Sequence, residues 1–207
     1  MNETADLFAA DAFADNAPTI PARRLKAQAA RLLIADGGGF VTREVERLAV
    51  ELDGLASDRH HGHARPACSR VPWYPRGAPI RNSRQLSLVA PDELAEIARR
   101  LGLADVQPEW IGANLVIEGV TRLTRLPPGT RLHFPSGAAL AIEGENGPCR
   151  HAGVSIGAHY PEQEGLDLRF PQVARGLRGL VAWVERAGDL TTGEIEVRVP
   201  AQHLWRG

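Results

Sequence analysis

Lysine is almost absent from this sequence. Lys26 is the only lysine among 24 basic residues, and all the others are arginines. An enzyme that holds pyridoxal phosphate needs a lysine for the Schiff base with the cofactor. Lys26 lies at the edge of an N-terminal tail, which is a poor place for a buried catalytic amine. The sequence therefore argues against pyridoxal phosphate as a cofactor.

Long apolar runs and a strong net charge are also missing. No apolar run approaches the roughly 20 residues that a bilayer-spanning helix needs. The formal net charge is −1, so bulk electrostatics does not attract the chain to nucleic acid or to anionic membranes. With 207 residues, 43% of them hydrophobic, the chain is long enough for one substantial domain. We expect a globular protein that binds neither nucleic acid nor membrane.

The N-terminus lacks the basic start and apolar core of a signal peptide, because its first residues are acidic. The default expectation is a cytoplasmic protein whose two cysteines, Cys68 and Cys149, are both reduced. Residues 1–23 are rich in Ala, Asp and Asn and are predicted to form a flexible tail, with an amphipathic helix over Asp6 to Phe13 as an alternative. Residues 24–207 are predicted to form a single domain.

Most of the periodic segments are short and strand-like. The clearest helix is Pro91 to Leu101, with acidic residues in its first turn, arginines in its last and Gly102 after it. A second short helix is predicted over Gly176 to Ala187. Strands are predicted over Ala29–Ala35, Thr42–Leu52, Ser83–Ala90, Thr130–Phe134, Ala138–Glu143 and Gly193–Val199. The pattern favours an α+β, predominantly β, barrel-like domain with a few short helices.

Residues 54–83 form a long stretch with little periodicity, which is typical of a functional or disordered loop. It holds His60, His61 and His63 next to Asp58, and Cys68 adds a soft ligand. The spacing of the histidines does not match the helical pair of zinc proteases, and zinc sites usually show recognisable ligand spacings. A zinc site is therefore not expected. We expect Asp58 and His60 to supply acid–base or anion-binding groups instead.

Cys149 is the residue with the most reactive setting. It lies in the segment Asn146-Gly-Pro-Cys-Arg-His-Ala-Gly153, in which Gly147 and Gly153 are expected to let the chain bend on either side. Two potential cations, Arg150 and His151, follow the thiol, and a thiolate stabilised by positive charge is the reactive form of cysteine. The alternative is a small buried cysteine in a tight turn.

Several motifs in order resemble those of the MOSC domain family, named for the C-terminal domain of molybdenum cofactor sulfurases. The resemblance covers roughly residues 27–200 and rests on Gly54-x-x-x-Asp58-Arg59-His60-His61-Gly62, Arg84-Gln-Leu-Ser-Leu-Val89, Gly112-Ala-Asn114-Leu115, Pro148-Cys149 and Gly179-Leu-Val-Ala182 with Gly188-Asp-Leu190 and Gly193. Two positions depart from the family pattern. Ala113 stands where an acidic residue is common, and Ser57 stands where a glycine is usual.

The resemblance implies a β-rich barrel and a cysteine, Cys149, that carries sulfur or ligates molybdenum. It also implies pocket roles for Arg84 and Asn114, because a guanidinium suits a phosphate or a pterin carbonyl pair and an amide donates and accepts at once. Asn146 and His61 complete the expected substrate- or cofactor-binding set, with Arg150 and His151 placed to hold the thiolate.

Three functions are consistent with these features. The first is a sulfur carrier, or a protein that binds the molybdenum cofactor through Cys149, working with a sulfur-donor or electron-transfer protein. The second is a cofactor-independent lyase or hydrolase in which Cys149, Asp58 and His60 act on a small sulfur- or nitrogen-containing substrate. The third is a binding module without catalytic activity.

Overall fold

The computed structural model describes residues 19–37 and 39–203 of the chain. The helix considered over Asp6 to Phe13, and most of the predicted N-terminal tail, lie outside these ranges. Within them, Thr19–Ile20 form the short strand β1, which pairs with β15 (Gln202–His203). None of the described helices is long and apolar enough to cross a membrane.

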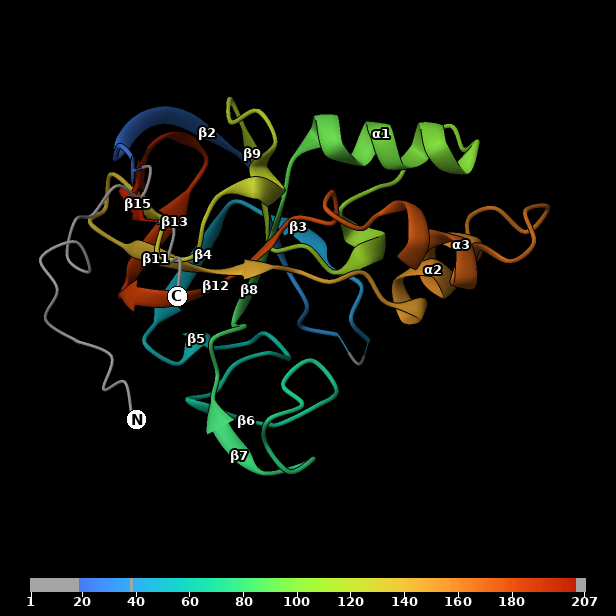
Figure 1. Cartoon of the computed structure of the whole chain (residues 1–207), viewed down its shortest axis with the longest axis horizontal. Coiled ribbons are helices and arrows are strands. Elements are labelled where there is room, and N and C mark those ends of the chain that lie inside the picture. Colours follow the sequence, from blue (N-terminus) through green and yellow to red (C-terminus); the bar gives the residue numbers. More distant parts are fainter. Residues whose placement is uncertain (1–18, 38, 204–207) are drawn as a thin grey trace, which may run out of the picture.

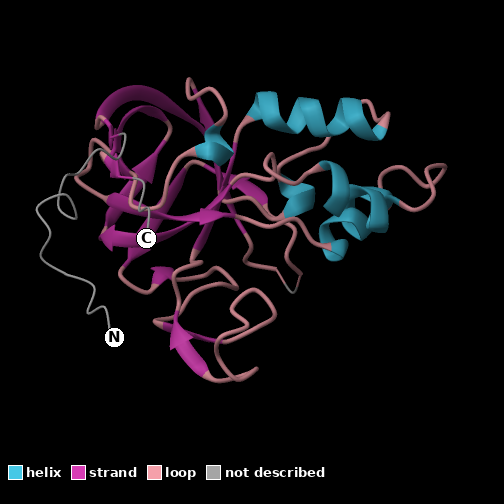
Figure 2. Ribbon diagram, viewed as in Figure 1, coloured by secondary structure: helices cyan, strands magenta, loops and turns pink. Residues whose placement is uncertain are grey.

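The main body is a closed barrel of seven strands, with the helices gathered at one end (Figures 1 and 2). Pairing between β14 and β2 closes the barrel, and only β8 and β9 run parallel. The predominantly β, α+β fold that the sequence predicts is confirmed. In spatial order the barrel strands are β14 (Gly193–Val199), β10 (Arg131–His133), β11 (Ala139–Glu145), β12 (Leu180–Arg186), β8 (Leu86–Val89), β9 (Leu115–Glu118) and β2 (Arg23–Ile34).

Two of these strands show where the alternation of apolar and polar residues predicts a barrel strand and where it does not. β14 has the bounds expected from its pattern, and Ile195, Val197 and Val199 point into the core. β2 begins at Arg23, six residues before the expected Ala29, because its polar first half is recognisable only from its pairing with β14. In this half the single lysine, Lys26, lies on the outer face and pairs with Glu194.

The segment 176–187 is not a helix. Residues Leu180–Arg186 form β12, a buried barrel strand between β8 and β11. The apolar run from Leu180 to Val184 fits both a helix and a strand that is buried on both faces, and periodicity alone does not distinguish the two. Pairing on both sides decides in favour of the strand.

The region predicted as one strand over Thr42–Leu52 is two strands in two sheets. The first, β3 (Arg43–Val45), extends the barrel sheet beside β2, whereas β4 (Arg47–Glu51) pairs with β5 (Gly54–Leu55) and β13 (Gly188–Thr191). The long loop expected over residues 54–83 contains a hairpin of β6 (Ala64–Pro66) and β7 (Pro79–Arg81), which projects from the barrel in Figure 1.

The helices form a layer at one end of the barrel (Figure 2). Helix α1 (Pro91–Leu101) has the predicted bounds and ends at Gly102, whose φ of 71° suits glycine. Two further helices were not expected, α2 (Arg150–Gly157) and α3 (Leu166–Val173). The short 3-10 turn η2 (Glu109–Ile111) contacts α2, whereas a second 3-10 turn, η3 (Leu123–Arg125), lies against the barrel strand β11.

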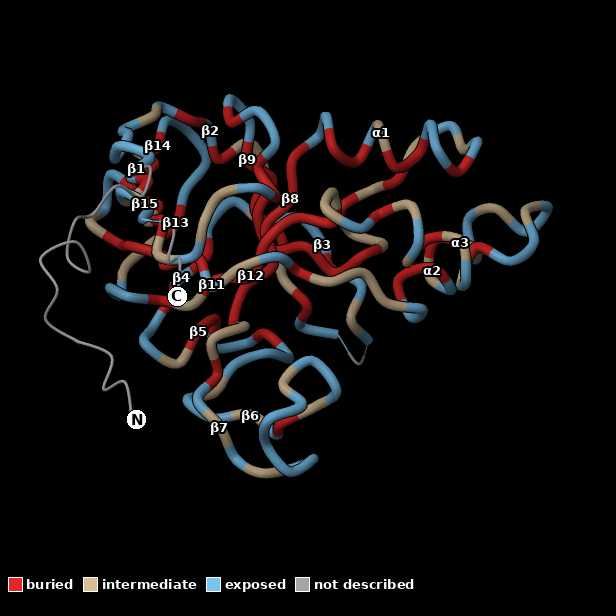
Figure 3. Tube along the Cα trace, viewed as in Figure 1, coloured by how far each residue is buried: buried red, intermediate tan, exposed pale blue. Residues whose placement is uncertain are grey.

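The buried side chains form two clusters, and Figure 3 shows where the buried residues lie along the chain. One fills the barrel and includes Leu32, Leu88 and Leu115. The other lies between the barrel wall and the helices around Phe170, and Cys149 packs against its edge. The helix layer therefore places Cys149 where the second cluster meets the end of the barrel.

Candidate functional site

Cys149 occupies the N-cap of helix α2, with an extended backbone (φ −133°, ψ 159°). The residue therefore precedes the unpaired N–H groups of the first turn, at the end of the helix where negative charge is favoured, and its thiol makes no capping hydrogen bond in the structure. Gly153 does not bend the chain as the sequence suggested, because it lies inside α2. A Cβ there would come 2.5 Å from the carbonyl oxygen of Leu166, so glycine lets α2 pack closely on α3.

Two adjoining cavities meet at Cys149. The inner pocket, of about 390 Å³, is lined by deep residues such as Ser87 and Arg178 and by Cys68. The outer pocket, of about 900 Å³, opens past Pro148 and is lined by residues of the cysteine segment. The residues that line both pockets are Phe40, Arg59, His60, Arg70, Arg84 and Cys149. Cys149 is thus accessible from both sides.

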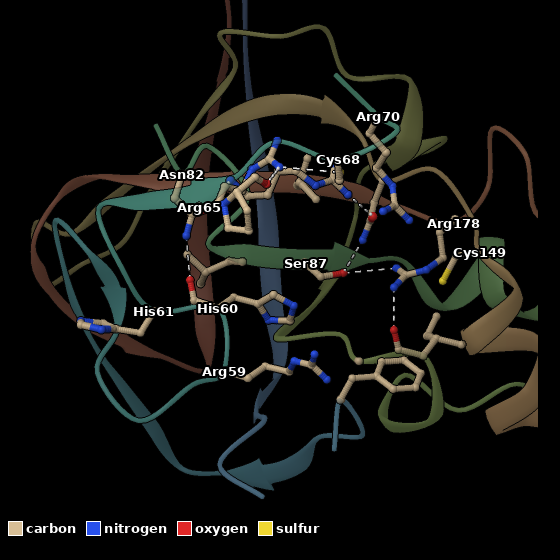
Figure 4. Close-up of a pocket in the computed structure, with 18 of the residues that line it drawn as sticks. Arg59, His60, His61, Arg65, Cys68, Arg70, Asn82, Ser87, Cys149 and Arg178 are labelled. Atoms are coloured by element: carbon tan, nitrogen blue, oxygen red, sulfur yellow. Dashed lines mark hydrogen bonds between the residues drawn. The ribbon is translucent and has the colours of Figure 1, made fainter. Parts of the chain in front are cut away.

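The inner pocket is strongly cationic. None of the described residues that line it is an aspartate or a glutamate. Its charged and titratable groups are Arg59, Arg65, Arg70, Arg84, Arg178, His60, His61, Cys68 and Cys149 (Figure 4). Because arginine is always protonated near neutral pH, this lining favours a small anion.

Arg178 is the most deeply buried of these cations. Its guanidinium donates to the Ser87 hydroxyl (3.2 Å) and to the Ile111 carbonyl (2.6 Å), and Figure 4 shows it next to Cys149. Burial lowers the pKa of Arg178 to about 10, while the nearby Cys149 acts in the opposite direction. At neutral pH Arg178 is therefore a buried cation whose described hydrogen-bond partners are all neutral, which favours negative charge on the sulfur or on a bound ligand.

Arg84 lines both pockets and is held by an amide. Its guanidinium donates to Asn146 Oδ1 (2.8 Å), and Asn146 Nδ2 donates in turn to the Ser87 hydroxyl (2.9 Å). Burial, together with the charges of Arg70 and Arg65, lowers the pKa of Arg84 to about 10. Asn146 and Ser87 thus fix both buried guanidinium groups at the pocket floor.

The structure places Asp58 behind the pocket wall. Its fully buried side chain accepts four hydrogen bonds, from Ala35 N, Asn114 Nδ2, His60 N and His60 Nδ1, at 2.8–3.0 Å. Burial acts to raise the pKa of Asp58, but the hydrogen bonds from His60 and Ala35 outweigh it and the net pKa is lowered. Asp58 is therefore an anionic anchor that orients His60, and His60 is the group that lines the pocket.

Asn114 also acts from behind the wall. Its buried amide accepts from Ser87 N and donates to Asp58 and to the Leu33 carbonyl, which joins β8, β2 and the loop before β9. Neither Asn114 nor Asp58 lines the inner pocket. The two side chains therefore support the site from behind its wall and do not line the pocket.

The remaining predicted residues lie at the edges of the site. Arg150 pairs with Asp167 of α3, and both Arg150 and His151 are exposed at the outer pocket. His61 lines the inner pocket, but Figure 4 shows its ring directed away from that of His60. In the described part of the chain, no three His, Cys, Asp or Glu side chains are grouped so as to hold a metal ion.

Sequence reasoning missed Arg178, Ser87, Arg59 and Arg70 as pocket residues. Arg178 immediately precedes the Gly179-Leu-Val-Ala182 motif, and Ser87 lies inside the Arg84–Val89 motif. The sequence signal that could have identified these two residues was thus a polar side chain within or directly beside a family-like motif. The strand that carries Ser87 is otherwise apolar, and a polar group in such a strand needs a partner.

Replacing Asp58 by Asn should destabilise the fold by about 1–3 kcal/mol, because one amide N–H₂ would face donors that now bind a carboxylate oxygen. The pKa of Asp58 is lower in the folded than in the unfolded chain, so its carboxylate stabilises the fold above about pH 4. This contribution is lost as the pH falls through the folded-state pKa. Urea unfolding at pH 3 and pH 7 should therefore show a smaller pH dependence in Asp58→Asn than in the wild type.

The matched control is Asp53→Asn in the turn between β4 and β5, because Asp53 also faces a histidine, His63 at 3.5 Å, but both side chains are exposed. Exposed pairs contribute about 0–1 kcal/mol, so this variant should unfold like the wild type. Equal effects of the two substitutions would contradict the anchoring role of Asp58.

The family model for the MOSC domain matches residues 57–197. A Bacillus subtilis (strain 168) protein, described as "Putative metal-sulfur cluster biosynthesis proteins YuaD", is 44% identical over 176 residues, which cover 84% of this chain and 92% of that protein.

Solved structures support the same assignment. The crystal structure of YuaD from Bacillus subtilis aligns with a TM-score of 0.84 at 43% identity, over 86% of this chain and 98% of that chain. YiiM from Geobacillus stearothermophilus aligns with a TM-score of 0.54 at 15% identity, over 87% and 76% of the two chains, and shares the fold. The match over most of the length, together with the ordered motifs around Cys149, shows that this chain belongs to the MOSC domain family.

Proposed function

We propose that Cys149 carries sulfane sulfur, receiving it from a donor in the outer pocket and passing it to an anionic acceptor. The observation that carries this proposal is the position of Cys149, at a helix N-terminus between two pockets and beside the buried Arg178. The printed description of the related YuaD protein, which refers to metal–sulfur cluster biosynthesis, is consistent with sulfur handling. The reaction fits a reducing cytoplasm, where thiols stay free.

The proposed chemistry is the transfer of a sulfane sulfur atom from the donor to the Cys149 thiolate. The Cys149 thiolate attacks the outer sulfur of a persulfide or thiosulfate donor, an S–S bond forms at Cys149, and the donor leaves as a thiolate or as sulfite. Arginines that line both pockets hold the anionic donor and the departing anion, and the described lining of the inner pocket contains no carboxylate, whereas Glu145 lines the outer pocket. The outer pocket leaves room for a sulfur-donor protein to present its persulfide to Cys149.

Binding of the molybdenum cofactor is the second candidate, and the donor set fits it. Two buried guanidinium groups, on Arg84 and Arg178, suit the anionic tail of such a group, and Cys149 offers a soft thiolate ligand. When bound, the cofactor would supply a redox-active metal centre, for which an electron-transfer partner would be needed. The protein's own groups would orient the cofactor and exclude competing cations.

The lyase or hydrolase interpretation has less support from the geometry. It requires an acid–base pair at the reacting atoms, whereas the Asp58 carboxylate is fully used in hydrogen bonds behind the wall. Of Asp58 and His60, only His60 lines the pocket, so His60 would have to act without Asp58 at the reacting atoms.

Intact mass and metal content of the full chain, purified from a molybdenum-replete host, separate these functions. Sulfur carriage predicts a fraction of molecules heavier by one sulfur atom, removed by a thiol reductant. Cofactor binding predicts one molybdenum per chain. A bare thiol and no metal, even after incubation with thiosulfate or polysulfide, would contradict both.

Replacing Arg84 by Gln should weaken binding of thiosulfate by about 10–100-fold, because a charge-assisted contact is worth about 1.5–3 kcal/mol. Calorimetric titration at pH 7.5 measures this change. Wild-type affinity should fall as the pH approaches 10, the value to which burial lowers the pKa of Arg84 and Arg178. Arg131→Gln is the control, since Arg131 lies on β10 and pairs with Glu185. An unchanged affinity in Arg84→Gln would show that the anion binds elsewhere.

A further inference from the structure

The inner pocket contains a second thiol. Cys68 lies on the loop between β6 and β7 and lines the inner pocket together with Cys149, whereas the outer pocket includes Cys149 but not Cys68. Both cysteines are free and partly exposed. A sulfur atom that enters from the outer pocket therefore meets Cys149 first and Cys68 second.

The surroundings of Cys68 are those of a nucleophile. Arg65 directs a guanidinium nitrogen at the sulfur (3.8 Å), and Arg70 lines both pockets. The Arg70 backbone N–H and the side chains of Arg70 and Arg65 lower the pKa of Cys68, against a smaller opposing effect of burial. Arg65 Nε is buried and has no hydrogen-bond partner among the described residues.

The loop that carries Cys68 is held in shape by its own hydrogen bonds. Ala67 N donates to the Ala78 carbonyl (2.8 Å), and Val71 N donates to the Cys68 carbonyl (2.9 Å). The loop thus presents Cys68 at a defined place on the pocket wall, while the hairpin itself projects from the barrel (Figure 1). A persulfide on Cys149 extends by one S–S bond, about 2 Å, into the same cavity.

We infer that Cys68 is a second sulfur carrier, which takes the outer sulfur atom from a persulfide on Cys149. The inference rests on the proposed function. The Cys68 thiolate attacks the outer sulfur, a Cys68–sulfur bond forms, and the bond between Cys149 and that sulfur breaks. The electron pair leaves on the Cys149 thiolate and the proton stays on the transferred sulfur, so the step needs neither an oxidant nor a reductant.

The structure favours attack on the outer sulfur over attack on Cys149 itself. In the first case the leaving group is the Cys149 thiolate, beside Arg178 and the N-terminus of α2. In the second case the leaving group is free hydrosulfide, which departs into the arginine-lined pocket and does not stay at the N-terminus of α2. Exchange is faster when the leaving thiolate is stabilised, so the relay product is a Cys68 persulfide rather than a disulfide.

The test follows the sulfur atom with time. Full-length protein receives a substoichiometric amount of inorganic polysulfide, is alkylated at intervals, and is digested for mass spectrometry of the Cys68 and Cys149 peptides. In the wild type, sulfur should appear on Cys149 first and then on Cys68, at a rate unchanged by dilution because the transfer is intramolecular. In Cys149→Ser, sulfur on Cys68 should fall at least about 10-fold, because the local donor is lost.

The other possible results either overturn the relay alone or overturn the proposed function as well. Equal labelling of Cys68 in Cys149→Ser, an unlabelled Cys68 in the wild type, or a Cys68–Cys149 disulfide with release of sulfide would overturn the relay. In Cys68→Ser, sulfur should remain on Cys149. If Cys149 is loaded in that variant while wild-type Cys68 stays bare, only the relay fails. If Cys149 carries none in any variant, the proposed function fails with it.

A pair of arginine variants tests the electrostatic part of the inference. Arg70→Gln should slow the transfer to Cys68, because Arg70 contributes to stabilising the attacking thiolate. Arg76→Gln is the matched control, since Arg76 is exposed on the same loop and does not line either pocket. Equal transfer rates in the two variants would contradict the role of Arg70.

Discussion

Cys149→Ser should lose sulfur transfer while keeping its fold. The rate of transfer from thiosulfate to a thiol acceptor should fall at least about 1,000-fold, since removal of a nucleophile typically costs that much or more. Serine is a favoured N-cap residue, so helix α2 should keep its start and the melting temperature should stay within about 2 °C. Steady-state release of sulfite and a thermal melt measure the two quantities.

The control for this substitution is Val154→Ala, an exposed residue on the same helix. It should leave both the rate and the melting temperature unchanged. If Cys149→Ser retained the wild-type rate, sulfur carriage by Cys149 would be wrong. A binding role, or chemistry at His60, would then explain the pocket better.

Gly179→Ala should produce the largest loss of stability. Gly179 has φ +96°, and a Cβ there would lie 1.9 Å from the carbonyl oxygen of Leu88, which is backbone in the adjacent strand β8. Strand β12 must therefore move away from β8, or the turn before it must change. We expect the free energy of unfolding in urea to fall by about 3–5 kcal/mol.

The same variant should also damage the site. The Gly179 carbonyl accepts from Asn146 N (2.8 Å), its N–H donates to Thr124 Oγ1 (2.8 Å), and Arg178 is its neighbour. Gly147→Ala is the control, because a Cβ at Gly147 meets nothing within 4 Å. That variant should be within about 0.5 kcal/mol of the wild type. Similar losses in the two would refute the close packing of β12 on β8 at this point.

Local sequence patterns predicted the helix and the strand that carry their own signals. They did not predict strands that are defined only by pairing with their neighbours. Helix α1 carries its own start and stop signals, and β14 alternates, so both have the expected bounds. The first half of β2 is polar and β12 is continuously apolar, so only their neighbours in the barrel reveal them as strands. Helix α2 was missed because it begins directly at Cys149, within a segment that reads as a turn.

The candidate site was predicted as a set of residues but not as an arrangement. Cys149, Arg84 and His60 line the pocket, whereas Asp58 and Asn114 support it from behind. A sequence motif indicates that a residue is needed, but not whether its side chain lines the pocket or supports the pocket wall from behind. Arg178 directly precedes the Gly179 motif but was missed, because its importance arises from burial without a carboxylate partner.

The closure of the barrel has a consequence for any shortened form of this protein. The span matched by the family model begins at residue 57, whereas β2 ends at Ile34 and joins β14 to β9. A chain trimmed to the matched span would lack β2, and its sheet would open along two long edges. Unpaired N–H and C=O groups would then face solvent on β9 and β14, next to an apolar interior. Such edges are templates for aggregation, so a chain trimmed to the matched span is expected to aggregate where the longer chain does not.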